Sequence, residues 1–103
     1  MSKFYNITGS TGVTVELIKP DSDVGIKSVL LTNVHDTLDA TVTLFLQDDP
    51  ASGTTNTYNV INLVAIPATT SLFLDNASMF SRPTAFGLYI TVGSGDTVDV
   101  IIG

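Results

Sequence analysis

Side chains able to carry out catalysis are few in this sequence. The 103 residues include one histidine, His35, and no cysteine. Nucleophilic catalysis needs a nucleophile, a base and a group that orients the base. Histidine is the commonest type of base, but His35 lies beside Asp36 in a polar segment where we expect a solvated turn. We therefore predict that the protein is not an enzyme.

Two pairs of aspartates come closest to a metal or acid–base site. Asp48 and Asp49 are adjacent, so extended backbone would point them to opposite sides. Asp21 and Asp23 follow Pro20 and could share one face of a turn. Turn formation by Asp explains both pairs, and neither loop has the spaced ligand layout of a dedicated calcium site. We expect no cofactor and no dedicated metal site, and leave open whether a loop binds calcium.

Glycines and tyrosines offer two weaker ligand-binding patterns. Gly93 and Gly95 have the spacing of phosphate-binding glycines, but a phosphate cradle lies between a strand and a helix. Here strands are expected on both sides, so we interpret the segment as a hairpin turn. Tyr5, Tyr58 and Tyr89 fall on separate expected strands and could stack on sugars or bases. Because the chain has only four basic residues, core packing or subunit contact is the favoured interpretation.

The elements that would position these side chains are strands, because hydrophobic residues recur with a period of two along most of the chain. The predicted strands are 4–8, 13–17, 25–34, 40–47, 57–65, 71–75, 87–92 and 97–102. No segment has a sustained helical period, although 76–83 could hold one helical turn. The pattern predicts one all-β domain over residues 1–103, an antiparallel β-sandwich of about eight strands, jelly-roll-like, with the strand order open.

Some predicted strands carry apolar side chains on faces that a free monomer would expose. Phe45 points away from the side shared by Val42 and Leu44, and segment 57–65 is apolar on both faces. Such strands lie in the middle of a sheet or under a partner. The residues predicted to contact other subunits are Phe4, Tyr5, Ile7, Phe45, Tyr58 and Phe73.

Composition excludes several classes of partner. The net charge is -6 and charged residues make up 14% of the chain. Four scattered cations cannot neutralise a phosphate backbone, so we expect neither nucleic acid nor an anionic membrane surface as a partner. No stretch approaches the ~20 apolar residues of a membrane span, and the start of the chain lacks the apolar run of a secretory signal. We expect a protein that is made and used without export.

Four runs in the central half of the chain share one strand rhythm, and these are SVLLTN (28–33), ATVTLFLQD (40–48), TYNVINLVAIPA (57–68) and TSLFLD (70–75). Together they resemble small β-sandwich virion proteins of tailed bacteriophages, among them capsid decoration (cement) proteins. The resemblance implies a non-enzymatic structural protein of the virion, assembled in the host cytoplasm. It implies the major capsid protein or other virion proteins as partners, and a homo-oligomer with a trimer favoured.

Three functions remain open on this basis. The first is a decoration protein that binds and stabilises the head shell. The second is a structural subunit of the tail, neck or baseplate. The third is a lectin-like module that binds a glycan, which would require aromatic and acidic side chains to meet at one loop end, for example Tyr58 or Tyr89 near Asp48 and Asp49.

Overall fold

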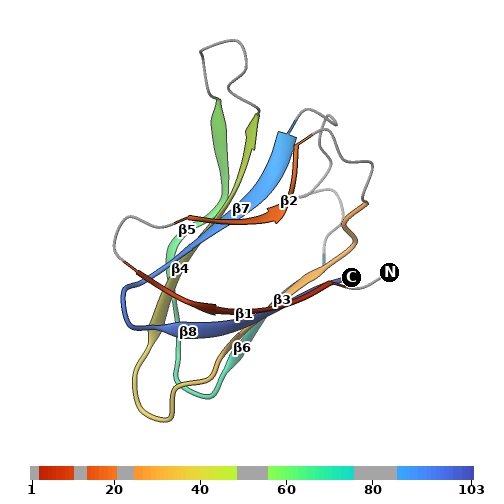
Figure 1. Cartoon of the computed structure of the whole chain (residues 1–103). Helices are drawn as coiled ribbons and strands as arrows, with labels where there is room; N and C mark the ends of the chain where they lie inside the picture. The colour runs from red at the N-terminus through yellow and green to blue at the C-terminus, as the bar shows by residue number, and fades with distance from the viewer. Residues whose placement is uncertain (1–2, 11–13, 21–24, 49–55, 76–85) are drawn as a thin grey trace.

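The computed structural model describes residues 3–10, 14–20, 25–48, 56–75 and 86–103, and these form eight strands in two sheets (Figure 1). The first sheet contains, in spatial order, β1 (Lys3–Thr8), β8 (Thr97–Ile102), β3 (Val29–Asn33) and β6 (Ser71–Leu74). The second sheet contains β2 (Val15–Ile18), β7 (Phe86–Val92), β4 (Ala40–Asp48) and β5 (Thr57–Ile66). Every pairing is antiparallel, and the described residues include no helix. The predicted all-β sandwich is confirmed.

The strand order is that of a jelly roll. Four pairings, β4–β5, β3–β6, β2–β7 and β1–β8, join the two halves of the chain like the arms of one long hairpin. Two further pairings, β3–β8 and β4–β7, roll that hairpin into two sheets of four strands. The start of β1 therefore lies beside the end of β8, with Lys3 opposite Ile102 (Figure 1).

The predicted strands match the observed ones to within one or two residues at most ends, with two larger differences in the described residues. Residues 25–28 precede β3 and are not part of it, although Ile26 is buried in the core. The predicted hairpin of 87–92 with 97–102 is wrong, because β7 and β8 belong to different sheets. The turn between them therefore carries the chain from one layer to the other. The helical turn predicted at 76–83 lies outside the described residues.

The core lies between the inner faces of the two sheets, where every second residue of the central strands is buried. In β8 the buried residues are Val98, Val100 and Ile102, and in β7 they are Leu88, Ile90 and Val92. Each fully buried side chain of this kind contributes about 1.5–3 kcal/mol relative to an exposed one. The same alternation sends the intervening residues of each strand to the outer face, which is where the candidate site lies.

Candidate functional site: the outer face of the first sheet

A row of four apolar side chains crosses the outer face of the first sheet from edge to edge. The register places Ile101 of β8 opposite both Phe4 and Leu30, and Leu30 is also opposite Phe73 of β6. The two aromatic ends are the most exposed, Phe4 at 71% and Phe73 at 57%, while the two aliphatic residues are half-buried. We call these four residues the apolar row.

A polar row runs parallel to it, two residues away along each strand. Asp99 lies opposite Asn6 and Thr32, and Thr32 lies opposite Ser71. The side-chain amide of Asn6 donates a hydrogen bond to Asp99, and the hydroxyl oxygens of Thr32 and Ser71 are 2.8 Å apart. The side chains of the polar row are thus bonded to one another in pairs. The carboxylate of Asp99 is the one charged group in the two rows.

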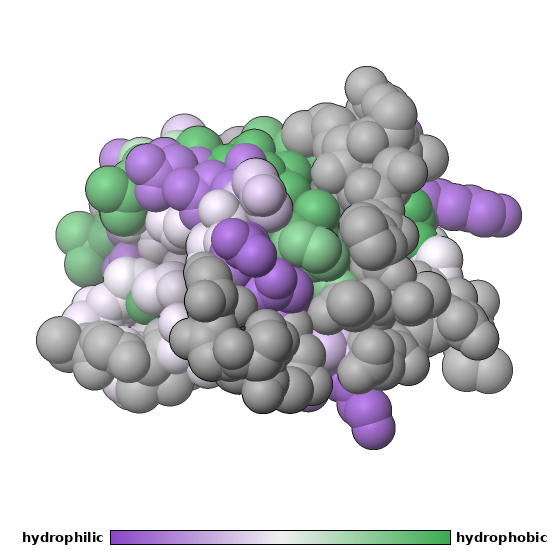
Figure 2. Space-filling view, turned by 90° about the horizontal axis from the view of Figure 1, so that it is seen from above, coloured by the Kyte–Doolittle hydropathy of each residue, from purple (hydrophilic) through white to green (hydrophobic). Residues whose placement is uncertain are grey.

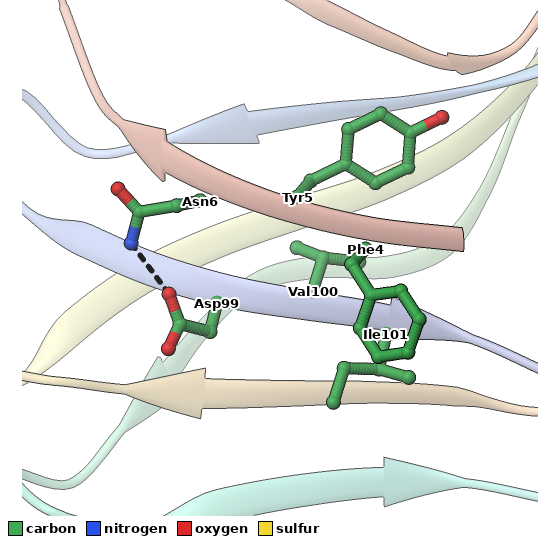
Figure 3. Close-up of a pocket in the computed structure, with 6 residues that line it drawn as sticks. All are labelled: Phe4, Tyr5, Asn6, Asp99, Val100 and Ile101. Carbon is green, nitrogen blue, oxygen red and sulfur yellow. Dashed lines mark hydrogen bonds between the residues drawn. The ribbon is translucent and has the colours of Figure 1, made fainter. Parts of the chain in front are cut away.

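A shallow hollow of about 300 Å³ lies on β1 and β8, where it is lined by residues of both rows (Figure 3). Its lining residues are Phe4, Tyr5, Asn6, Asp99, Val100 and Ile101. Figure 3 shows the Phe4 ring and Ile101 on one side of the strand pair and the Tyr5 ring on the other. The outer face therefore offers an exposed aromatic ring next to a hydrogen-bonded amide and carboxylate.

The view from above shows a different kind of surface (Figure 2). It looks onto the end at which β4 and β5 extend beyond the other strands (Figure 1). Among the described residues seen there, apolar groups are broken up by polar ones, without the continuous row that the register produces across the first sheet.

Two of the predicted contact residues, Phe4 and Phe73, form the two ends of the apolar row. Two others, Tyr5 and Ile7, make contacts within the chain. The Tyr5 hydroxyl donates a 2.6 Å hydrogen bond to the main-chain oxygen of Leu17, which links the first sheet to the second. Ile7 is only 6% exposed and belongs to the core. Both side chains point inward because they alternate along β1 with the outward Phe4.

The remaining two predicted contact residues lie on the second sheet. Phe45 does point to the outer face, but it stacks on Tyr89 with ring centroids 5.6 Å apart and is only 9% exposed. Little of this ring is left for a partner. Tyr58 is 60% exposed, and its ring centroid lies 5.9 Å from that of Phe86. The second sheet thus presents one accessible aromatic residue from the predicted set.

Sequence reasoning missed Leu30 and Ile101, which complete the apolar row. Each stands between two buried residues of its strand, so each was hidden in a run that is apolar at every position. Such a run gives no contrast between the two faces of a strand. The positions of Leu30 and Ile101 could still have been found, because odd- and even-numbered residues of one strand face opposite sides of the sheet.

His35 has a structural position that differs from the expected solvated turn. Its Nε2 atom is 3.1 Å from the main-chain oxygen of Gly95 and 3.9 Å from Oδ1 of Asp96. The other carboxylate oxygen of Asp96 accepts a 3.1 Å hydrogen bond from the main-chain N–H of Thr41. The half-buried imidazole thereby joins the turn after β3 to the turn before β8, and its acidic neighbour is Asp96 instead of the adjacent Asp36.

The candidate glycine and aspartate patterns also have structural positions. Gly93 accepts a 2.9 Å main-chain hydrogen bond from Asp96, and Gly95 has a φ of 83°, so the segment is a tight turn, although it does not close the predicted hairpin. The carboxylate of Asp48 accepts two 2.8 Å hydrogen bonds from Asn56. Those bonds, the main-chain one first, hold the pKa of Asp48 below its ordinary value.

The other candidate acids, Asp21, Asp23 and Asp49, lie outside the described residues. Within the described part of the chain, no three His, Cys, Asp or Glu side chains gather closely enough to hold a metal ion. The same part contains no helix long and apolar enough to span a membrane.

No family model, curated protein or solved structure matches this chain. The function is therefore argued from the surface just described and from the resemblance found in the sequence.

Proposed function

We propose that this protein is a non-enzymatic structural subunit of a tailed-phage virion, and specifically a capsid decoration protein that binds and stabilises the head shell. The observation that carries the proposal is the apolar row, which leaves two large aromatic side chains exposed on the outer face of the first sheet. Support also comes from the jelly-roll order, an architecture used in viral capsid domains, and from the run of residues 28–75 that resembles small virion proteins.

The size of the apolar row indicates how such a subunit would bind. Aromatic side chains present about 150–250 Å² each, so Phe4 and Phe73 together leave roughly 250 Å² of ring surface exposed. Covering that area gains about 6 kcal/mol at ~25 cal/mol per Å². Association costs an estimated 4–15 kcal/mol, so the apolar row alone gives weak binding. Stable attachment requires further contacts on either side of the row, as a continuous protein shell provides.

The electrostatics of the same face are compatible with a neutral or basic partner surface. Asp99 is the one charge in the two rows, and Asn6 already donates to it. The chain as a whole carries a net charge of -6, which favours the solubility of the free protein before assembly. A partner therefore buries little unpaired charge when it covers the apolar row.

A tail, neck or baseplate subunit is the runner-up within the same class, since the apolar row serves equally well there. Labelling of intact particles separates the two. Label over the whole head supports decoration, and label at one vertex supports the tail-side role.

Glycan binding is a second candidate from a different class, favoured by the hollow on β1 and β8. The exposed Phe4 ring adjoins the Asn6 amide and the Asp99 carboxylate there, which are groups able to stack on and hydrogen-bond a sugar. Binding on a glycan array that is abolished by Asp99→Ala would support this candidate over decoration.

The test of decoration adds purified protein to expanded heads that lack it and measures co-sedimentation and the melting temperature of the heads. Wild-type protein is expected to bind to saturation and to raise that temperature. The double variant Phe4→Ser/Phe73→Ser is expected to lose both effects. Leu38→Ser is the matched control, because Leu38 is 61% exposed and lies in the turn after β3, outside the apolar row. Failure of saturating wild-type protein to bind heads would reject the decoration role.

A further inference from the structure

The four edge strands of the sandwich are not equally protected against pairing with another strand. β2 and β6 are only four residues long, and β2 also has a register shift. β5 contains two register shifts and a residue, Leu63, with a φ of 51°. β1 is six residues long, pairs with β8 without any shift and contains no proline. Short or bulged edges resist strand addition, whereas a regular edge invites it.

The free edge of β1 presents three main-chain N–H and C=O pairs. The N–H of Gly9, just past the strand, donates to Asp96 at 2.8 Å on the β8 side. Successive residues of a strand direct these groups to opposite sides, so the odd-numbered residues of β1 bond to β8. The residues whose groups face away from β8 are Phe4, Asn6 and Thr8. No described residue pairs with them on that side.

When two copies of β1 run in opposite directions, their residue types complement each other. Two aromatic residues, Phe4 and Tyr5, precede Asn6, and two β-branched residues, Ile7 and Thr8, follow it. We propose that two copies of this chain pair antiparallel through β1, with the two-fold axis at Asn6. Each aromatic residue then faces a β-branched residue of the second copy, which is a favourable cross-strand pair, and Asn6 faces Asn6 of the second copy.

This register satisfies every outward main-chain group of β1. Phe4 faces Thr8 of the second copy, Asn6 faces its own counterpart, and Thr8 faces Phe4 of the second copy. Three facing pairs with two hydrogen bonds each give six bonds across the axis. The register also keeps inward residues opposite inward ones, so no polar face is turned toward a core.

The charged side chains at and beside β1 do not oppose the pairing. Lys3 is the one charged residue of β1, and in this register the two copies of Lys3 lie at opposite ends of the new pair. Six residues of strand separate them, about 20 Å at the usual rise. That distance exceeds the ~8 Å Debye length at physiological salt. In the middle, the two Asn6 side chains lie between the two Asp99 carboxylates and keep them apart.

The result is a dimer with one continuous eight-stranded sheet, whose outer face carries two apolar rows. The inference goes beyond the proposed function and does not depend on it. It assigns two-fold symmetry to the free protein, where the resemblance in the sequence favoured a trimer.

Single cysteines test the register directly, because the chain has no cysteine of its own. In the proposed dimer two Cα atoms at position 6 lie about 5.5 Å apart, within reach of a disulfide. Two copies of position 4 are offset by four residues, about 13 Å, which is beyond that reach. Asn6→Cys is therefore expected to form a covalent dimer under mild oxidation, at least about tenfold faster than Phe4→Cys. A mixture of Phe4→Cys and Thr8→Cys is expected to cross-link as a heterodimer.

The control for random collision is Ser71→Cys, which puts the thiol on the same face at the opposite edge of the sheet. Far-ultraviolet circular dichroism shows whether each variant keeps its fold. Cross-linking of Asn6→Cys no faster than that of Ser71→Cys would overturn the pairing. Faster cross-linking of Phe4→Cys than of Asn6→Cys would overturn the register and with it the proposal.

Sedimentation equilibrium of the unmodified protein supplies a reversible readout. Asn6→Lys places two ammonium groups face to face at the axis, so its dimer Kd is expected to rise at least about tenfold. Ser71→Lys makes the same change in net charge at the other edge and is expected to leave the Kd unchanged. A wild-type monomer that still binds heads would overturn the dimer and leave the virion role standing. A wild-type dimer that fails to bind heads would overturn the decoration role and leave the dimer standing.

Discussion

The side-chain amide of Asn33 in β3 donates a 2.9 Å hydrogen bond to the main-chain oxygen of Ile66 in β5, and so joins the two sheets from inside the core. The same amide donates at 2.8 Å to Leu38, and its oxygen accepts at 2.9 Å from the N–H of His35. Asn33 is fully buried, the one buried polar side chain among the described residues. Its three bonds fix the turn after β3 against the opposite layer.

Asn33→Ala is therefore expected to lower the free energy of unfolding by about 2–4 kcal/mol, because it leaves buried carbonyl groups without donors. Asn62→Ala, at an exposed position of β5, is the control and should change it by less than about 0.5 kcal/mol. Urea denaturation followed by circular dichroism measures both. Equal losses in the two variants would mean that the buried network adds nothing to stability.

Leu63 combines an exposed side chain with a backbone conformation that leucine rarely adopts. It is 70% exposed and has a φ of 51°, at the point where β5 shifts register against β4. Asparagine tolerates this region better, so Leu63→Asn is expected to stabilise the protein by about 0.5–1 kcal/mol. Leu38→Asn, at a position that is 61% exposed and has no positive φ, should give no gain. The midpoint of thermal unfolding distinguishes the two variants.

The pH dependence of the β4–β5 connection follows from Asp48. Hydrogen bonds from the main chain and side chain of Asn56 lower the pKa of this carboxyl from 3.8. A pKa lowered by folding means that the ionised form of Asp48 favours its folded-state contact with Asn56. That contribution is fully present above the ordinary pKa and is lost as pH falls through the lowered one. Asn56→Ala removes the side-chain bond and keeps the main-chain one, so it is expected to raise the pKa of Asp48 only part of the way toward 3.8, as measured by nuclear magnetic resonance titration of its carboxyl carbon. An unchanged titration would contradict the contribution assigned to the Asn56 side chain.

Two phenylalanines on outer faces should behave differently. Phe45 is 9% exposed under Tyr89, so Phe45→Ala is expected to destabilise the fold by about 2–4 kcal/mol. Phe73 is 57% exposed, so Phe73→Ala is expected to cost less than about 1 kcal/mol. Guanidinium denaturation of the two variants under one condition makes the comparison. A similar cost for both would show that exposure does not separate structural from contact residues on these faces.

The strands were predictable because alternation with a period of two survives folding almost unchanged. The outward direction of Phe45 and Phe73 followed from the same alternation. Strand order did not follow, because alternation tells which residues share a face and not which strand lies alongside. That is why a short turn at Gly93–Gly95 suggested a hairpin where the chain in fact changes sheets. The apolar row depends on that order, so it emerged only once the register was known.

The contacts of individual side chains were harder to predict where the contacting residue is distant in sequence. Asp96 lies 61 residues after His35, and no local pattern connects the two. Tyr5 is of a residue type common at protein contacts, yet its hydroxyl donates a hydrogen bond to Leu17 in the other sheet. In each case the deciding contact is made across the sandwich, between segments that only the rolled topology brings together.

The rolled hairpin also sets the order in which a newly synthesised chain can acquire its structure. β4 and β5 are neighbours in sequence and can pair as soon as both have left the ribosome, whereas Asn6 must wait for Asp99, 93 residues later. Closing so long a loop is slow compared with forming a local hairpin. β1, the first of these eight strands to emerge, therefore stays without its partner strand until β8 has been made. Neighbouring nascent chains on one polysome expose identical copies of β1 to each other during that interval.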